Sequence, residues 1–92
     1  MSLTFRSTVR YFRPEKASGL AVADVPPDHA AALGGLKQMR VRGTINGREF
    51  TSSTMPAGGG RLAISVSKAM MSAAAVSIGE EADFAIVEWP AP

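Results

Sequence analysis

Residues 40–50 read RVRGTINGREF, and this stretch predicts a β-hairpin. Asn46-Gly47 is the preferred pair for a two-residue type I′ turn, in which both turn residues need a positive φ. A turn of this length fixes the strand register, so residues 45, 44, 43 and 42 face residues 48, 49, 50 and 51. Gly43 then faces Phe50, and we expect the Phe50 ring to cover this strand glycine.

The same register divides the hairpin into an apolar face and a polar face. The apolar face carries four residues: Val41, Gly43, Ile45 and Phe50. The polar face carries six: Arg40, Arg42, Thr44, Glu49, Thr51 and Ser53. Two interpretations stay open, namely a solvated surface on which Glu49 partly neutralises Arg42, or an arginine surface that binds an acidic partner.

Four further strands are expected outside the hairpin. Apolar and polar residues alternate from residue 3 to residue 12, which is the period-2 pattern of a half-buried strand. The other strands are expected at residues 19–25, 61–66 and 82–89. Segments 13–19 and 55–62, both containing proline or glycine, are expected to be connections, and Gly79 a turn.

Two short helices are expected between these strands. The first can begin at the proline pair 26–27 and end at the glycine pair 34–35. For the second, Ser67 is a suitable N-cap, and the helix continues to about Ala75.

The order strand, short helix, loop, strand occurs twice along the chain. An offset of 41 residues superposes Val25 on Val66, the last residue before each helix. This repeat predicts two-fold pseudo-symmetry in a mainly-β fold, a small closed or double-split barrel of about six strands with two short helices. We expect one domain over residues 1–92, and a monomer is favoured over a dimer because the repeat supplies both halves of the barrel.

Composition narrows the class of protein. The chain has 92 residues, a net charge of +2 and no cysteine, which fits one small domain without disulfides. No apolar run approaches the roughly 20 residues of a membrane-spanning helix, and the N-terminus lacks the apolar segment of a signal peptide. We therefore expect a cytoplasmic protein that does not contact membranes.

The sequence offers little material for catalysis or metal binding. His29 is the single histidine, and a nucleophile of the hydrolase kind needs such a base within reach. Adjacent helical residues point in different directions, so Asp28 and His29 do not form a metal site. We expect no catalytic residue, no metal and no cofactor, and the protein is not expected to be an enzyme.

The segment Gly58-Gly59-Gly60-Arg61 resembles an anion cradle, since glycine-rich loops can turn successive N–H groups toward a phosphate. A P-loop would place a lysine at the start of a following helix, whereas a strand is expected here. The segment is therefore interpreted either as a flexible loop or as an oxyanion contact made with Arg61.

Together these patterns predict one binding surface on the barrel. Its residues are Arg40, Arg42, Gly58, Gly59, Gly60, Arg61 and Lys68. We expect a small anionic ligand or a protein partner there, because the basic residues and the glycines flank the same hairpin. Nucleic acid is a weaker alternative, since the stacking aromatics of single-strand binders are scarce and no basic recognition helix is expected.

The segments VRGTINGREF, MPAGGGRLAISVSKAM and IGEEADFAIVE, in that order, resemble the bacterial domain-of-unknown-function family nineteen-oh-five over nearly the whole chain. The matching positions are Gly43, Asn46, Gly47, Phe50, Pro56, Gly58, Gly60, Lys68 and Gly79. The resemblance implies a double-split β-barrel, similar in architecture to the AbrB and MazE transcription regulators, and some members carry a bacteriocin-protection domain. This chain departs from the family pattern at Glu80, often aspartate, and at Met71, often arginine.

The resemblance leaves function open, and three hypotheses follow. The first is a non-enzymatic barrel that binds an anionic ligand. The second is a DNA-binding regulator, which would lose affinity steeply with salt. The third, a small-molecule enzyme, would have to work with His29 and scattered carboxylates.

Overall fold

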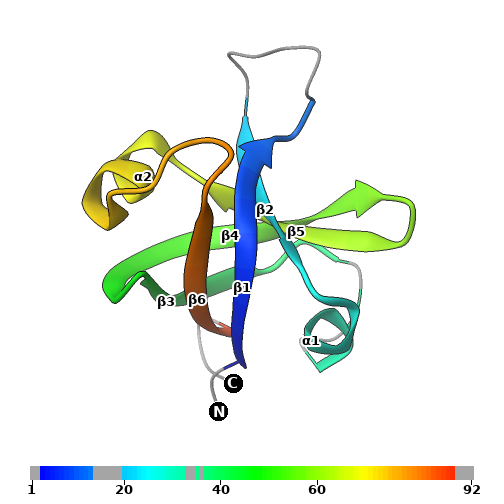
Figure 1. Cartoon of the computed structure of the whole chain (residues 1–92). Helices are drawn as coiled ribbons and strands as arrows, with labels where there is room; N and C mark the ends of the chain where they lie inside the picture. Colours follow the sequence, from blue (N-terminus) through cyan, green and yellow to red (C-terminus); the bar gives the residue numbers. More distant parts are fainter. Residues whose placement is uncertain (1–2, 14–19, 33–34, 36, 89–92) are drawn as a thin grey trace.

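In the computed structural model, which describes residues 3–13, 20–32, 35 and 37–88, the chain forms a closed barrel of antiparallel strands in the order β1-β2-β5-β4-β3-β6. The strands are β1 (Leu3–Tyr11), β2 (Ala21–Val25), β3 (Arg40–Ile45), β4 (Arg48–Gly58), β5 (Arg61–Val66) and β6 (Glu81–Glu88). The helices are α1 (Pro27–Ala32) and α2 (Lys68–Ala74), and they lie at opposite sides of the barrel (Figure 1). The predicted mainly-β barrel with two short helices is confirmed.

The hairpin of β3 and β4 has the predicted register. Gly43 pairs with Phe50, and Thr44 pairs with Glu49. The turn residues Asn46 and Gly47 have φ angles of 50° and 82°, as a type I′ turn requires. The local pair Asn-Gly therefore sets which hairpin residues face the core.

Gly43 pairs with Phe50 as expected and also lies close to β6. A Cβ at this position would clash with the carbonyl oxygen of Ala85 and lie 2.9 Å from the Cα of Ile86. The three nearest atoms are all backbone atoms of β6, so the close approach of β6 requires a glycine here.

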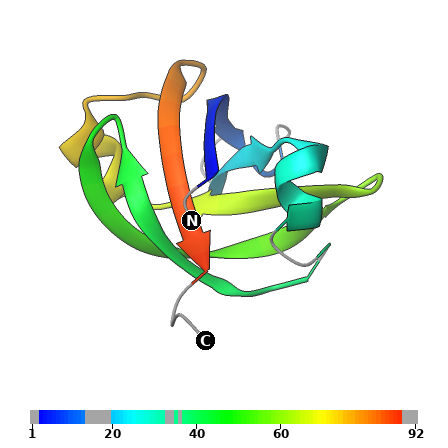
Figure 2. The ribbon, with the colours of Figure 1, turned by 90° about the horizontal axis from the view of Figure 1, so that it is seen from below.

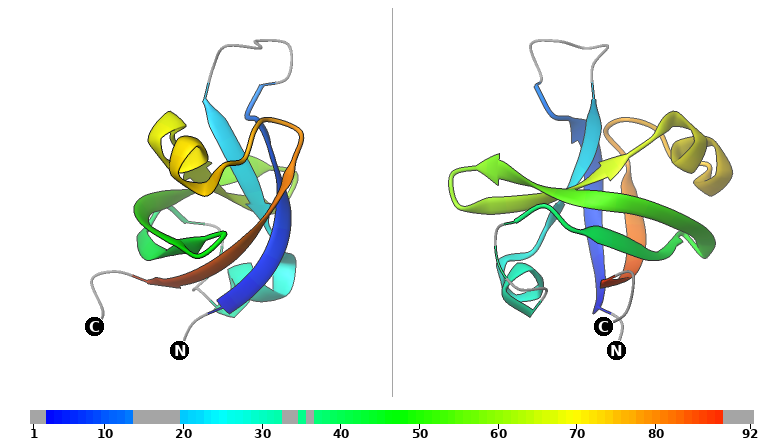
Figure 3. Two further views of the ribbon diagram at one scale, coloured as in Figure 1. Left: turned by 60° about the vertical axis from the view of Figure 1, so that its left-hand side comes forward. Right: turned by 180° about the vertical axis from the view of Figure 1, so that it is seen from behind.

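The strand pairing obeys the predicted two-fold pseudo-symmetry. Ala23 pairs with Ile64 and Thr44 pairs with Ala85, and the members of each pair are 41 residues apart. The same two-fold rotation superposes the pairing of β1 with β6 on the pairing of β4 with β3. Strand β1 therefore corresponds to β4, with an offset of 45 residues. Two views of the ribbon show the helices on opposite sides (Figure 3). The two halves of the chain therefore build one barrel around a shared axis.

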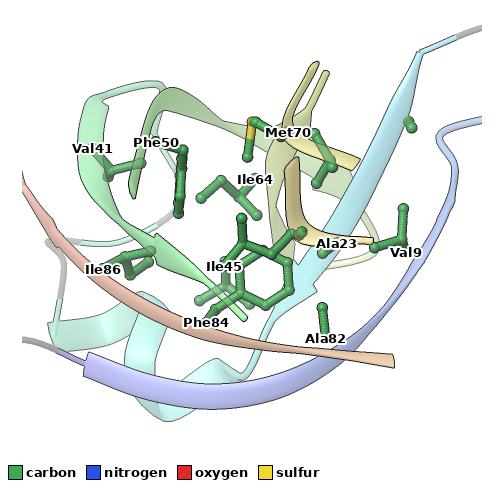
Figure 4. Packing of buried hydrophobic residues seen from close by; sticks show 14 of the residues in the cluster. Val9, Ala23, Val41, Ile45, Phe50, Ile64, Met70, Ala82, Phe84 and Ile86 are labelled. Carbon is green, nitrogen blue, oxygen red and sulfur yellow. The ribbon is translucent and has the colours of Figure 1, made fainter. Parts of the chain in front are cut away.

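The core contains inward-facing residues from all six strands. Phe84 stacks on Phe5 with ring centroids 5.3 Å apart and meets Phe50 edge-on at 6.5 Å. Figure 4 shows Phe50 and Phe84 within the cluster. The largest hydrophobic side chains with at most 1% exposure are Val9, Val22, Val41, Ile45, Leu62, Ile64, Ile86 and Phe84. Replacing a buried phenylalanine by alanine costs about 3–5 kcal/mol in such cores. With the core so filled, any binding site must lie on the outer surface.

The two helices are held by different contacts. In α2, the N–H of Met70 donates to the N-cap hydroxyl of Ser67 at 3.1 Å. In α1, the Nε2 of His29 donates to the carbonyl oxygen of Thr4 at 2.9 Å, which ties the helix to β1. His29 is thus in a structural contact with the barrel.

Several boundaries differ from the sequence-based expectation. Segment 55–62 is not wholly a connection, because β4 continues through Pro56 to Gly58, with a register irregularity there. The pairing with β3 ends at Ser53, so Pro56 lies where one side of β4 needs no ladder hydrogen bond. The remaining strand and helix ends shift by one or two residues, and the expected boundary residues Gly19, Gly34 and Trp89 lie outside the described residues.

Within the described residues, no helix is both long enough and apolar enough to cross a membrane.

Candidate functional site

A groove of about 630 Å³ lies on the outer face of β3, β4 and β6. Its lining residues are Arg42, Gly43, Thr44, Glu49, Phe50, Thr51 and Val87, and we call it the Arg42 groove. Figure 2 shows the β3–β4 hairpin curving beside β6, with which β3 is paired. A hollow of this volume is within the range of sites that take small molecules.

Strand alternation places the polar side chains in the groove. Val41 and Ile45 are buried in the core, so Arg42 and Thr44, which lie between them on the other face, point outward. Arg42 lies opposite Thr51 on β4 and opposite Val87 on β6. The groove bed is therefore three strands wide, with the arginine on its central strand.

The groove contains two opposite charges, on Arg42 and Glu49. Arg42 and Glu49 are both exposed, and within the described part of the chain neither side chain makes a salt bridge. Exposed pairs of this kind contribute only about 0–1 kcal/mol, so little stability is lost by leaving them apart. The groove thus presents one guanidinium and one carboxylate beside the hydroxyls of Thr44 and Thr51.

The arginines of β1 are in the opposite situation. Arg6 donates to both carboxylate oxygens of Asp83, at 2.8 and 3.3 Å, with Glu81 3.9 Å away. Arg10 donates to both oxygens of Asp24, at 3.0 and 2.8 Å. The hydrogen bonds from these arginines lower the pKa of Asp83 and Asp24 from the ordinary value.

The pseudo-symmetry relates these two situations residue by residue. Arg6 faces Asp83 across the β1–β6 ladder, and the corresponding positions of the β4–β3 ladder are Thr51 and Arg42. At one place the chain supplies a carboxylate to its own arginine. At the other, a threonine stands opposite the arginine, and the guanidinium remains available.

The structure does not bring the predicted site residues to one rim. Gly58 ends β4, Gly59 and Gly60 form the turn, and Arg61 begins β5. Lys68 begins α2, and Figure 1 shows α2 and the β4–β5 turn on opposite sides of the barrel. Only Arg42 of the predicted set lines the groove, while Arg40 is an exposed residue at the start of β3.

Gly60 and Arg61 instead border a second hollow of about 260 Å³ between β1, β2, α1 and the β4–β5 turn. Arg6 and Asp24 also line it, but both are engaged in the ion pairs of β1. The positive charge of Arg61 acts on Asp24, whose pKa is lowered first by its hydrogen bond from Arg10 and to a smaller extent by Arg61. Most of the charge around this hollow is therefore balanced within the protein.

The predicted turn residues serve the fold. Asn46 accepts a hydrogen bond from the Asp83 N–H at 2.8 Å and donates to the carbonyl of Ala74 at 3.2 Å. Gly79 has a φ of 93°, and its N–H donates to the carbonyl of Val9 at 2.7 Å.

Among the described residues, no group of three or more acidic, histidine or cysteine side chains is arranged to hold a metal ion.

Sequence reasoning named Thr44, Glu49 and Thr51 as neighbours on the hairpin face, but did not place them in a site. Val87 was missed entirely, because its position beside Arg42 depends on the pairing of β3 with β6. No local pattern in either strand signals that long-range pairing.

A family model matches residues 5–86 of the chain, and its description is "Domain of unknown function (DUF1905)". A search of curated proteins found no match.

Proposed function

We propose that this chain, which belongs to the DUF1905 family of domains of unknown function, is a non-enzymatic binding domain that holds a small anionic ligand in the Arg42 groove. One observation carries the proposal: an exposed arginine without an ion pair, among the described residues, lines a groove of about 630 Å³. A planar guanidinium binds a carboxylate or phosphate through two parallel hydrogen bonds. The ligand thus supplies the anionic partner of an ion pair with Arg42.

The other lining residues suit the same role. The hydroxyls of Thr44 and Thr51 can donate to further ligand oxygens, and Val87 offers an apolar wall. The single histidine does not line the groove, and its Nε2 is engaged with Thr4. These residues support binding rather than acid–base catalysis.

The domain is proposed to act as a monomer, because six strands of one chain already close the barrel. DNA binding is the second candidate, and the charge distribution disfavours it. Two arginines of β1, Arg6 and Arg10, each donate to a carboxylate. Neutralised arginines contribute little to phosphate contacts, on which such affinity depends.

The test is an NMR titration of isotopically labelled protein with sodium acetate and with inorganic phosphate. We expect amide shifts at Thr44, Thr51 and Val87 in the wild type. Arg42→Gln should abolish them, whereas the matched control Arg48→Gln, a charge removed from the same hairpin outside the groove, should keep them.

Unchanged shifts in Arg42→Gln would overturn the assignment of the groove. Duplex DNA that shifted the same amides with an affinity falling steeply between about 50 and 200 mM salt would favour the regulator instead.

A further inference from the structure

The two unpaired charges of the groove lie on neighbouring strands. Arg42 faces Thr51, and Glu49 is two residues along β4 from Thr51, so Arg42 and Glu49 are diagonal neighbours. The Cβ atoms of such neighbours are about 7–8 Å apart, and both side chains are long. A compound that carries an anion and a cation on one carbon atom can therefore reach both groups.

On the β1 face, an arginine that faces a carboxylate across the strand ladder pairs with it. Asp83 occupies the place opposite Arg6, and the guanidinium meets its oxygens at 2.8 and 3.3 Å. In the other half the arginine, Arg42, stands at the position of Asp83, and Thr51 stands at the position of Arg6. A ligand carboxylate that lies over Thr51 can therefore pair with Arg42 across the ladder, as Asp83 pairs with Arg6.

Glu49 adds a requirement that a plain anion does not meet. It corresponds to Thr4 in the other half, so the carboxylate is specific to the Arg42 groove. A purely anionic ligand bound to Arg42 would be repelled by this nearby negative charge. A ligand with an ammonium group would turn the repulsion into a second ion pair.

We infer that the ligand of the Arg42 groove is a zwitterion, an α-amino acid with an apolar side chain, whose carboxylate pairs with Arg42 and whose ammonium group pairs with Glu49. This inference rests on the proposed function and specifies its ligand. Thr44 and Thr51 face Glu49 and Arg42 across the same ladder, and Val87 provides apolar surface for the side chain. The volume of about 630 Å³ leaves room for that side chain.

The experiment separates the two charges of the ligand. Labelled protein is titrated with L-leucine, which has both charges, with N-acetyl-L-leucine, which keeps the carboxylate alone, and with L-leucinamide, which keeps the ammonium alone. We expect L-leucine to bind about tenfold more tightly than either derivative, as one lost charge-assisted hydrogen bond implies.

Two variants assign the charges to residues. Glu49→Gln should weaken L-leucine about tenfold and leave N-acetyl-L-leucine unchanged or slightly tighter, because the repulsion is removed. Glu81→Gln is the matched control, since Glu81 is exposed on β6 and does not line the groove. That control should bind L-leucine like the wild type.

The outcomes distinguish this inference from the proposed function. Equal affinity for L-leucine and N-acetyl-L-leucine, or an unchanged L-leucine affinity in Glu49→Gln, overturns the zwitterion and leaves an anion site. If L-leucine causes no shift at the groove while acetate or phosphate does, the inference again fails alone. If no compound shifts the groove amides, both proposals fail.

Discussion

The outer faces of β1 and β4 are related by the pseudo-symmetry, yet they treat charge in opposite ways. On the β1 face, Arg6 and Arg10 are each satisfied by an aspartate of a neighbouring strand. On the β4 face, Arg42 and Glu49 line a groove without ion partners among the described residues. The backbone path is shared, so the difference arises from side chains alone.

This comparison teaches how a duplicated fold can acquire one binding face. On the β1 face, the charged side chains form ion pairs with one another. Few charged groups on this face therefore remain to bind a ligand. The β4 face leaves the guanidinium of Arg42 without an ion pair among the described residues, with little loss of stability, because exposed ion pairs contribute so little. Substitutions that break either face should therefore have separable effects on stability and on binding.

The largest loss of stability is expected from a substitution in the pairing of β3 with β6, which supports the Arg42 groove. Gly43→Ala would drive a Cβ into the backbone of Ala85, and a backbone atom cannot move aside as a side chain can. We expect a loss of at least about 3 kcal/mol in the free energy of unfolding, measured with urea. Gly47→Ala is the control, because its Cβ would meet no atom within 4 Å and only the positive φ is unfavourable, at about 1–2 kcal/mol. A Gly43→Ala loss no larger than that of the control would contradict the close approach of β6.

The next effect is expected at the turn between β3 and β4. Asn46→Ala removes the hydrogen bonds to Asp83 and Ala74 and places alanine at a φ of 50°. We expect a loss of about 2 kcal/mol in chemical denaturation. Asn46→Asp keeps the acceptor for the Asp83 N–H and should lose less, whereas equal losses would show that the acceptor contributes nothing.

A smaller, pH-dependent effect is expected on the β1 face. The hydrogen bond from Arg10 lowers the pKa of Asp24 in the folded protein, so the ion pair stabilises the fold above the unfolded pKa of about 3.9. That contribution is lost as the pH falls through the lowered folded pKa. Asp24→Asn should cost up to about 1 kcal/mol at pH 7 and progressively less toward pH 2, by urea unfolding across pH. The control Asp28→Asn, in exposed α1, should show no such trend, and a cost for Asp24→Asn that is the same at pH 7 and pH 2 would exclude the ion pair as its cause.

The sequence predicted most of the fold because the decisive signals are local. Asn46-Gly47 determined the hairpin register, and Ser67 marked the start of α2. The continuation of β4 through Pro56 could not be predicted, since it depends on where β3 stops pairing. The approach of β6 to Gly43 was not predicted for the same reason, because it is a long-range contact.

The candidate site was predicted only in part. Arg42 was named from strand alternation, which is local, and the structure places it in the groove. The glycine segment 58–60 and Lys68 were expected to join it, but the strand order sends the β4–β5 turn and α2 to opposite sides. The partners of Arg6 and Arg10, which decide which arginines remain available, are likewise fixed by strand pairing and not by sequence proximity.

The most direct measurement uses a variant in which Arg42 on the β4 face is given a carboxylate partner, as Arg6 has on the β1 face. Thr51→Asp places a carboxylate opposite Arg42, as Asp83 stands opposite Arg6, and should change the free energy of unfolding by only about 0.5 kcal/mol or less. In an NMR titration with L-leucine and with acetate, we predict that Thr51→Asp loses binding at the groove while the neutral control Thr51→Asn keeps it. Wild-type affinity in Thr51→Asp would contradict the claim that the unpaired guanidinium of Arg42 makes this face a binding site.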